Sequence, residues 1–126
     1  MKTFQDLIFK KHPLLESAEK TGILVDFWKG SRQATIDFGN GYELSVIFGK
    51  KFYSNGKDTY ECAVIKNGKQ EGDIRGYLTE LQVTYLMAEL QGYEVVNELH
   101  TNPDGSVDFN STGELFQTTF RKKGEL

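Results

Sequence analysis

The sequence has few of the residues that usually carry covalent or metal chemistry: its 126 residues include one cysteine and two histidines. The single cysteine, Cys62, cannot form an internal disulfide. A free thiol suits a reducing cytosol, although a secreted protein without disulfides stays as an alternative. The composition therefore argues against a disulfide-stapled scaffold and favours the cytoplasm.

The sequence also lacks a long apolar run and an excess of positive charge. Its formal net charge is −3, so no overall basic field attracts nucleic acid. The longest uncharged apolar run is far shorter than the ~20 residues that cross a bilayer. Residues 1–13 carry charges within their apolar run and offer no small-residue cleavage site, so we do not expect a signal peptide. No membrane partner is expected.

What the sequence does contain is a set of sixteen aromatic residues, made up of nine Phe, six Tyr and one Trp. Together with 38% hydrophobic and 26% charged residues, they indicate a packed core rather than a disordered chain. A chain of this length suits one core. We therefore predict a single domain over residues 1–126, in which residues 93–126 form a C-terminal extension.

The stretch IDFGNGYELSVIFG, residues 36–49, contains two glycines that either bind a phosphate or turn the chain. Apolar residues alternate with polar ones on both sides of the Gly-Asn-Gly, as in paired β-strands. A dinucleotide-binding fingerprint needs a third glycine where Leu44 stands, and a helix after it. Glycine and asparagine accept the positive φ angles of tight hairpin turns. The prediction is a β-hairpin with strands near 32–38 and 42–49.

A third strand is predicted near residues 59–66, within TYECAVI. Tyr60, Cys62 and Val64 share one of its faces, while Ala63 and Ile65 lie on the other, so this strand is expected to be central and covered on both sides. We also predict a short fourth strand after Asn67-Gly68.

The hydrophobic period then changes from two to that of a helix. In LTELQVTYLMAELQGY the residues Val83, Leu86 and Leu90 recur at helical spacing, and Thr79 with Gln82 fits a capping box. This predicts a helix over 79–91 that ends at Gly92. The fold class is therefore α+β: a mostly antiparallel sheet of about five strands, arranged as a meander, with one main helix packed across it.

Two further segments carry weaker patterns. Residues 3–10 predict a helical turn or two, broken near His12-Pro13 because proline disfavours a helical residue before it. Residues 93–122 predict extra strands, including YEVVNELHT, SVDF and ELFQTTFRKK, joined by Asn-Pro-Asp-Gly and Asn-Ser-Thr-Gly turns.

No set of residues predicts a catalytic or metal site, and no cofactor is expected. HTNPDGSVDF overlaps a calcium loop, but His100 and Ser111 stand where an anionic ligand and a bidentate glutamate belong. Cys62 is interpreted as a strand cysteine of the core, although pairing with a histidine stays as an alternative. The carboxylates, Glu61 among them, are expected mostly on solvent-facing positions.

One segment has the composition of a contact surface: FGKKFYSNGKDTY, residues 48–60. The candidate binding residues are three lysines and two aromatic residues of this loop: Lys50, Lys51, Phe52, Tyr53 and Lys57. Cations beside stackable rings suit either a protein hot spot or single-stranded nucleic acid. The alternative is a plain hairpin loop whose rings fold back on the core. Successive strand side chains face opposite ways, so at least one of Phe52 and Tyr53 should be accessible.

Three segments follow one another in order within residues 1–91: an Asn-Gly-Tyr hairpin with Ser-Val, a Tyr-Glu-x-Ala-Val strand, and a Gly-Tyr-Leu-Thr helix start. They are Asn40, Gly41, Tyr42, Ser45 and Val46; Tyr60, Glu61, Ala63 and Val64; and Gly76, Tyr77, Leu78 and Thr79. In these segments the chain resembles the small uncharacterised accessory proteins of tailed bacteriophages. The resemblance implies a viral or prophage accessory protein that acts in the host bacterial cytoplasm, and it implies no catalytic residues.

The function expected from these observations is binding rather than catalysis. The leading hypothesis is a non-enzymatic phage-type accessory protein that binds a host or phage macromolecule, such as a host enzyme or defence system that it inhibits. A protein partner is favoured over nucleic acid because the chain is acidic. The alternative is a small nucleic-acid or nucleotide-binding protein that uses the Lys50–Lys57 loop. The oligomeric state is left open.

Overall fold

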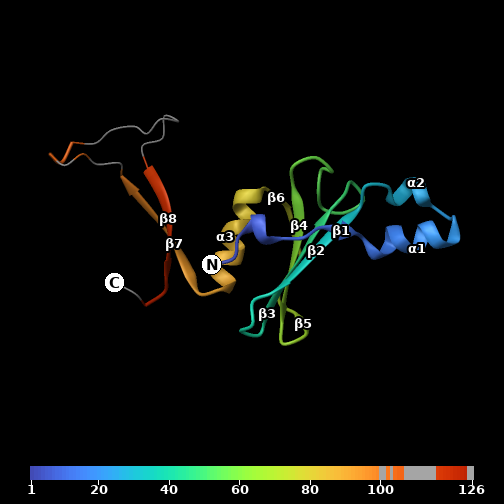
Figure 1. The fold of residues 1–126 in the computed structure, drawn as a ribbon, viewed down its shortest axis with the longest axis horizontal. Helices are drawn as coiled ribbons and strands as arrows, with labels where there is room; N and C mark the ends of the chain where they lie inside the picture. The colour runs from blue at the N-terminus through green and yellow to red at the C-terminus, as the bar shows by residue number, and fades with distance from the viewer. Residues whose placement is uncertain (100–101, 103, 107–115, 125–126) are drawn as a thin grey trace. The chain divides into compact units, whose positions relative to one another are not determined.

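The computed structural model describes residues 1–99, 102, 104–106 and 116–124 (Figure 1). The chain divides into two compact units, Met1–Gln91 and Gly92–Leu126, called unit 1 and unit 2 below. The division falls next to Tyr93, where the C-terminal extension was expected to begin. That the whole chain acts as a single domain stays a prediction.

Unit 1 is built on a six-stranded sheet in which every neighbouring pair is antiparallel. The strand order is β1-β2-β3-β4-β5, and β6 also pairs with β4. The strands are β1 (Lys10–Lys11), β2 (Arg32–Asp37), β3 (Tyr42–Phe48), β4 (Tyr60–Lys66), β5 (Lys69–Gln70) and β6 (Arg75–Leu78). The predicted α+β class and the central β2–β3–β4 meander are confirmed.

The Gly-Asn-Gly segment is the turn of the β2–β3 hairpin. Ile36 lies opposite Leu44 and Ala34 opposite Val46, so the alternating apolar residues share one face. Gly41 has a φ of 92°, and a Cβ there would lie 2.8 Å from the Asn67 side chain. Glycine is therefore required for both the backbone conformation and the close approach. The prediction of a turn is confirmed.

The main helix is α3 (Glu80–Leu90), and it packs against β4 and β6 (Figure 1). Its N-terminus is held by the predicted capping box: the Gln82 backbone N–H donates to the Thr79 hydroxyl over 3.2 Å, and the Thr79 N–H donates to the Gln82 side chain over 2.9 Å. Its buried residues meet the inner face of the sheet. This core comprises Leu44, Val46, Tyr60, Cys62, Val64, Val83, Leu86 and Met87.

The N-terminal segment lies alongside α3 and is hydrogen-bonded to it. Phe4 begins a single 3-10 turn, Phe4–Asp6, and its backbone N–H donates to the Thr84 hydroxyl over 3.1 Å. At the other end of the helix, the Lys2 N–H donates to Gln91 Oε1 over 2.7 Å, and Gln91 Nε2 donates to the Lys2 carbonyl over 2.8 Å. The first residues of unit 1 are therefore hydrogen-bonded to its last.

The N-terminal helical turn ends before His12-Pro13, as predicted, and His12 has an extended backbone, but a helix that was not predicted begins at Pro13. Helix α1 (Pro13–Thr21) has Pro13 in its first turn, where the missing N–H has no helical partner in any case. His12 is the N-cap, and its Nδ1 accepts from the Leu14 N–H over 3.0 Å. A short helix, α2 (Val25–Trp28), follows. These two helices form one end of unit 1 (Figure 1). In the segment from residue 3 to residue 10, where a helical turn or two was predicted, the structure has the single turn Phe4–Asp6.

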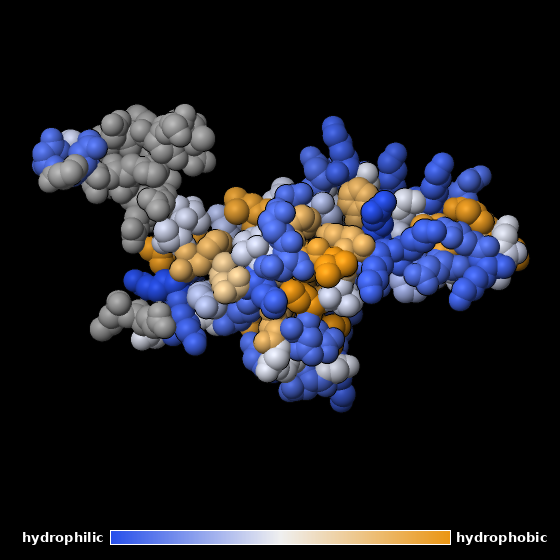
Figure 2. Space-filling model, viewed as in Figure 1, coloured by the Kyte–Doolittle hydropathy of each residue, from blue (hydrophilic) through white to orange (hydrophobic). Residues whose placement is uncertain are grey.

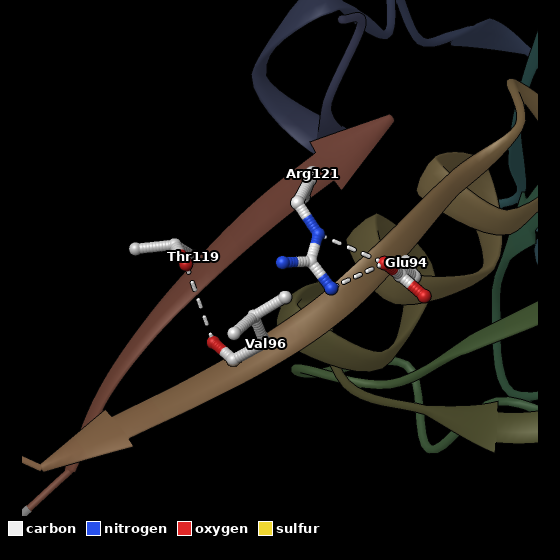
Figure 3. Close-up of polar contacts among 4 residues, drawn as sticks. All are labelled: Glu94, Val96, Thr119 and Arg121. Carbon is white, nitrogen blue, oxygen red and sulfur yellow. Dashed lines mark hydrogen bonds and ion pairs between the residues drawn. The ribbon is translucent and has the colours of Figure 1, made fainter. Parts of the chain in front are cut away.

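Unit 2 contains a two-stranded antiparallel sheet of β7 (Tyr93–Leu99) and β8 (Phe116–Lys122). Glu94 and Arg121 lie opposite each other, and Arg121 donates two hydrogen bonds, from Nε and from a terminal nitrogen, to Glu94 Oε1 (Figure 3). Two of the strands predicted within 93–122 are thereby confirmed. The strand predicted within SVDF lies largely outside the described residues.

None of the helices in the described part of the chain combines the length and the apolar character that a bilayer crossing requires.

Candidate contact surface on the β3–β4 loop

The β3–β4 loop, residues 49–59, is held in one conformation by side chains within it. The Ser54 hydroxyl accepts from the backbone N–H groups of Gly49 and Gly56, each over 3.1 Å, and donates to the Thr59 carbonyl over 2.7 Å. Asn55 Oδ1 accepts from three backbone N–H groups of the same loop, those of Lys57, Asp58 and Thr59. The loop is therefore a pre-organised turn.

The two aromatic residues of the loop have different environments. Phe52 is half-buried, with its ring centroid 4.7 Å from that of His12 and 5.8 Å from that of Trp28. Tyr53 is 58% exposed. The expectation that at least one of them is accessible is confirmed, and Phe52 is the one that folds back on the unit.

Tyr53 is paired with a second exposed ring that the loop composition did not reveal. Tyr77 on β6 is also 58% exposed, and the two rings meet edge to face with centroids 6.2 Å apart. Tyr77 is a non-glycine residue with a φ of 56°, and it lies where the β4–β6 register shifts. Its backbone N–H donates to the Tyr53 carbonyl over 2.9 Å. We call Tyr53 and Tyr77 the tyrosine pair.

Gly76 allows the β3–β4 loop, which carries Tyr53, to lie close to β6, which carries Tyr77. A Cβ at this position would lie 2.6 Å from Tyr53 Cβ, a separation that real atoms do not adopt. The absence of a side chain at Gly76 therefore lets the loop lie against β6. Bulged strands are a common means of aiming a side chain outward, here that of Tyr77.

The three candidate lysines, Lys50, Lys51 and Lys57, are all exposed, and none forms an ion pair within the described residues. The Lys51 ammonium lies 4.2 Å above the ring centroid of Phe27 on α2. Hydrophilic side chains project from the edge of unit 1 that carries this loop and α2 (Figure 2). The loop is therefore a cationic surface on a chain whose net charge is −3.

Glu61 departs from the solvent-facing position expected for it, because it is buried in the sheet. Its Oε1 accepts from the Tyr53 backbone N–H over 3.1 Å. Period-two alternation correctly assigns Glu61 to the face opposite Tyr60, but the β3–β4 loop folds over that face. The carboxylate thus anchors the backbone at the tyrosine pair.

Cys62 lies in the core of β4, as expected from its strand position. Burial disfavours the thiolate and raises the pKa of Cys62 to about 12. A thiol that stays protonated at neutral pH is a weak nucleophile. The alternative allows either histidine of the chain as its partner: His12 is the N-cap of α1 and its ring contacts Phe52, and His100 lies outside the described residues.

Metal-ligating side chains do not converge in the described part of the chain, where no group of three His, Cys, Asp or Glu could hold an ion. Asp104 instead closes a local turn: it accepts hydrogen bonds from the Ser106 hydroxyl and backbone N–H, which lower the pKa of its carboxyl. The outer positions of the calcium-like loop, His100 and Ser111, lie outside the described residues.

The buried N-cap His12 predicts a pH dependence of stability. Burial lowers the pKa of His12 below 6.5, and the negative charge of Glu61 offsets only part of this effect. The unfolded chain then binds a proton that the fold excludes. This contribution to stability is present above pH 6.5 and is lost as the pH falls toward the lowered pKa.

His12→Asn keeps a cap residue but removes this titration. We expect the melting temperature of the wild-type protein to fall more steeply below pH 6.5 than that of His12→Asn, measured by circular dichroism. Identical pH profiles would contradict the role given to His12.

Comparisons with protein-family models, with curated proteins and with solved structures give no match to this chain. The resemblance to phage accessory proteins therefore stays a prediction.

Proposed function

We propose that the protein is a non-enzymatic accessory protein of the tailed-phage type, which binds a protein partner in the bacterial cytoplasm through the tyrosine pair. The observation that carries the proposal is that Tyr53 and Tyr77 are both exposed and in ring contact. Exposed tyrosines are frequent anchors of protein interfaces because they bury much area with few rotatable bonds.

The backbone that carries the pair is hydrogen-bonded before any partner binds, which lowers the entropy lost on association. The Tyr53 backbone is held from two sides, with its N–H on Glu61 and its carbonyl on the Tyr77 N–H. The left-handed conformation of Tyr77 is a local cost that the fold sustains. Strain of this kind, next to an outward-facing ring, supports a role in recognition.

The lysines of the same loop provide a polar, cationic rim for the interface. Interfaces commonly surround an aromatic centre with charged groups that remain hydrated. Lys50 and Lys57 fit this arrangement, and a partner with an acidic surface would complement them. A host enzyme or a defence protein that is inhibited by occupation of its surface is the class of partner proposed.

The same combination of exposed rings and lysines that form no ion pair among the described residues also supports a second candidate, single-stranded nucleic acid. The salt dependence of binding distinguishes these two candidate functions. Nucleic-acid binding weakens steeply as salt rises because counterions are released, whereas an interface anchored by aromatic side chains depends less on salt.

The test is affinity capture from bacterial lysate with the wild-type protein and a Tyr53→Ala, Tyr77→Ala variant. We expect the variant to keep its melting temperature and to lose the captured protein, with affinity reduced by about 2 kcal/mol or more, roughly 30-fold. The control is Ile23→Ala, which truncates an exposed apolar side chain between α1 and α2. Equal capture by both variants would refute the interface, and capture abolished by nuclease or by moderate salt would favour nucleic acid.

A further inference from the structure

A cleft opens beside the β3–β4 loop, between this loop and the segment from α2 to β2. Its volume is about 310 Å³, which is the lower end of the range for small-molecule sites. Its side chains are Asp26, Phe27, Lys29, Ser31, Lys50 and Lys51 with Phe48, and the backbones of Gly30, Gly49 and Gly56 complete the lining. The tyrosine pair does not line it.

The charge of this cleft is positive. Lys29, Lys50 and Lys51 line it, together with one acidic residue, Asp26. None of these four side chains forms an ion pair within the described residues. Three cations around one concavity, in an acidic chain, repel one another unless an anion joins them.

One residue of the same cleft, Ser31, has a buried hydroxyl without a hydrogen-bond partner among the described residues. Ser31 is 1% exposed. Its backbone groups are hydrogen-bonded to Trp28 and His12, but its Oγ makes no hydrogen bond within the described part of the chain. The contrast is Ser54, also buried, whose hydroxyl makes three hydrogen bonds. Buried hydroxyls are usually paired, so an unpaired one calls for an explanation.

We propose that this cleft binds a small phosphorylated molecule, with its phosphate among Lys29, Lys50 and Lys51 and within reach of the Ser31 hydroxyl. A phosphate dianion supplies the two negative charges that three lysines and one aspartate leave uncompensated. Its oxygens accept hydrogen bonds from ammonium and hydroxyl donors alike. Bound there, it also satisfies the hydroxyl that the fold leaves unpaired.

The size of the cleft argues for a small molecule over a polymer. A volume of about 310 Å³ encloses a phosphate and a modest organic group. This site shares Lys50 with the rim of the protein interface proposed above, but it does not include the tyrosine pair that anchors that interface. Either proposal therefore stands if the other fails.

The test is a titration with inorganic phosphate and with adenosine monophosphate, at constant ionic strength, followed by amide chemical shifts. We expect saturable shifts at residues 29–31 and 49–51 for both ligands. The Lys29→Gln, Lys50→Gln variant should weaken both by about tenfold or more, since each lost contact involves a charge. Ser31→Ala should weaken them as well without loss of stability.

The matched control is Lys57→Gln, which removes a lysine of the same loop that does not line the cleft. It should bind both ligands with wild-type affinity. The proposal is overturned if neither ligand gives saturable shifts, if Lys57→Gln weakens binding as much as the double variant, or if only a single-stranded oligonucleotide binds.

Discussion

Ser54→Ala should lower the free energy of unfolding by about 2 to 4 kcal/mol, because one buried hydroxyl satisfies three backbone groups of the β3–β4 loop. Its removal leaves the N–H groups of Gly49 and Gly56 and the Thr59 carbonyl without this partner. Ser54 is buried, so water does not readily replace the hydroxyl. Urea denaturation followed by tryptophan fluorescence measures the change.

The matched control for this prediction is Ser31→Ala, at the other buried serine. Because the Ser31 hydroxyl makes no hydrogen bond within the described residues, its loss should leave the free energy of unfolding unchanged or raise it slightly. A similar destabilisation in both variants would show that hydrogen bonding at Ser54 is not what stabilises the loop.

Met87→Ala should be at least as destabilising, by about 2 to 5 kcal/mol, because it opens a cavity in the core of unit 1. Met87 is fully buried on α3, in the cluster that includes Leu44 and Val46 of the sheet. The surrounding strands are paired on both sides and are poorly able to collapse into the space. The same urea titration applies.

Leu81→Ala is the control on the same helix. Leu81 is 57% exposed, so its truncation should change stability by less than about 1 kcal/mol. The comparison isolates burial, since both substitutions leave alanine in α3. If Leu81→Ala proved as costly as Met87→Ala, the face of α3 that carries Leu81 would also be covered.

The parts of the fold that could be predicted from sequence are those specified by neighbouring residues. The β2–β3 hairpin follows from two glycines around Asn40, and α3 follows from the Thr79–Gln82 capping box and an apolar stripe. In each case a few consecutive side chains satisfy the backbone locally.

Two elements could not be predicted in this way, one because its local cap is unusual and one because it depends on distant residues. Pro13 is compatible with both ending and starting a helix, and the cap that decides between them is the unusual N-cap His12. Strand β6 has only four residues, and its pairing with β4 includes a register shift that no local pattern reports. Tertiary pairing decided the case of β6.

The candidate surface was predicted in part for the same reason. Composition drew attention to the β3–β4 loop, and alternation indicated that at least one of Phe52 and Tyr53 is accessible. Tyr77 was missed as a partner because it lies on another strand, 24 positions along the chain. The one sequence feature that pointed to Tyr77 is that it directly follows Gly76, the glycine against which Tyr53 packs.

The reciprocal hydrogen bonds between Lys2 and Gln91 bring the first and last residues of unit 1 together, although these positions are 89 apart in sequence. Where the ends of a fold meet, its starting point is a matter of connectivity rather than of packing. A short peptide could bridge the two ends, and new termini could be opened at the exposed Asn67-Gly68 turn between β4 and β5. Such a circular permutant would retain the sheet and α3 while presenting the tyrosine pair on a chain that begins in mid-sheet.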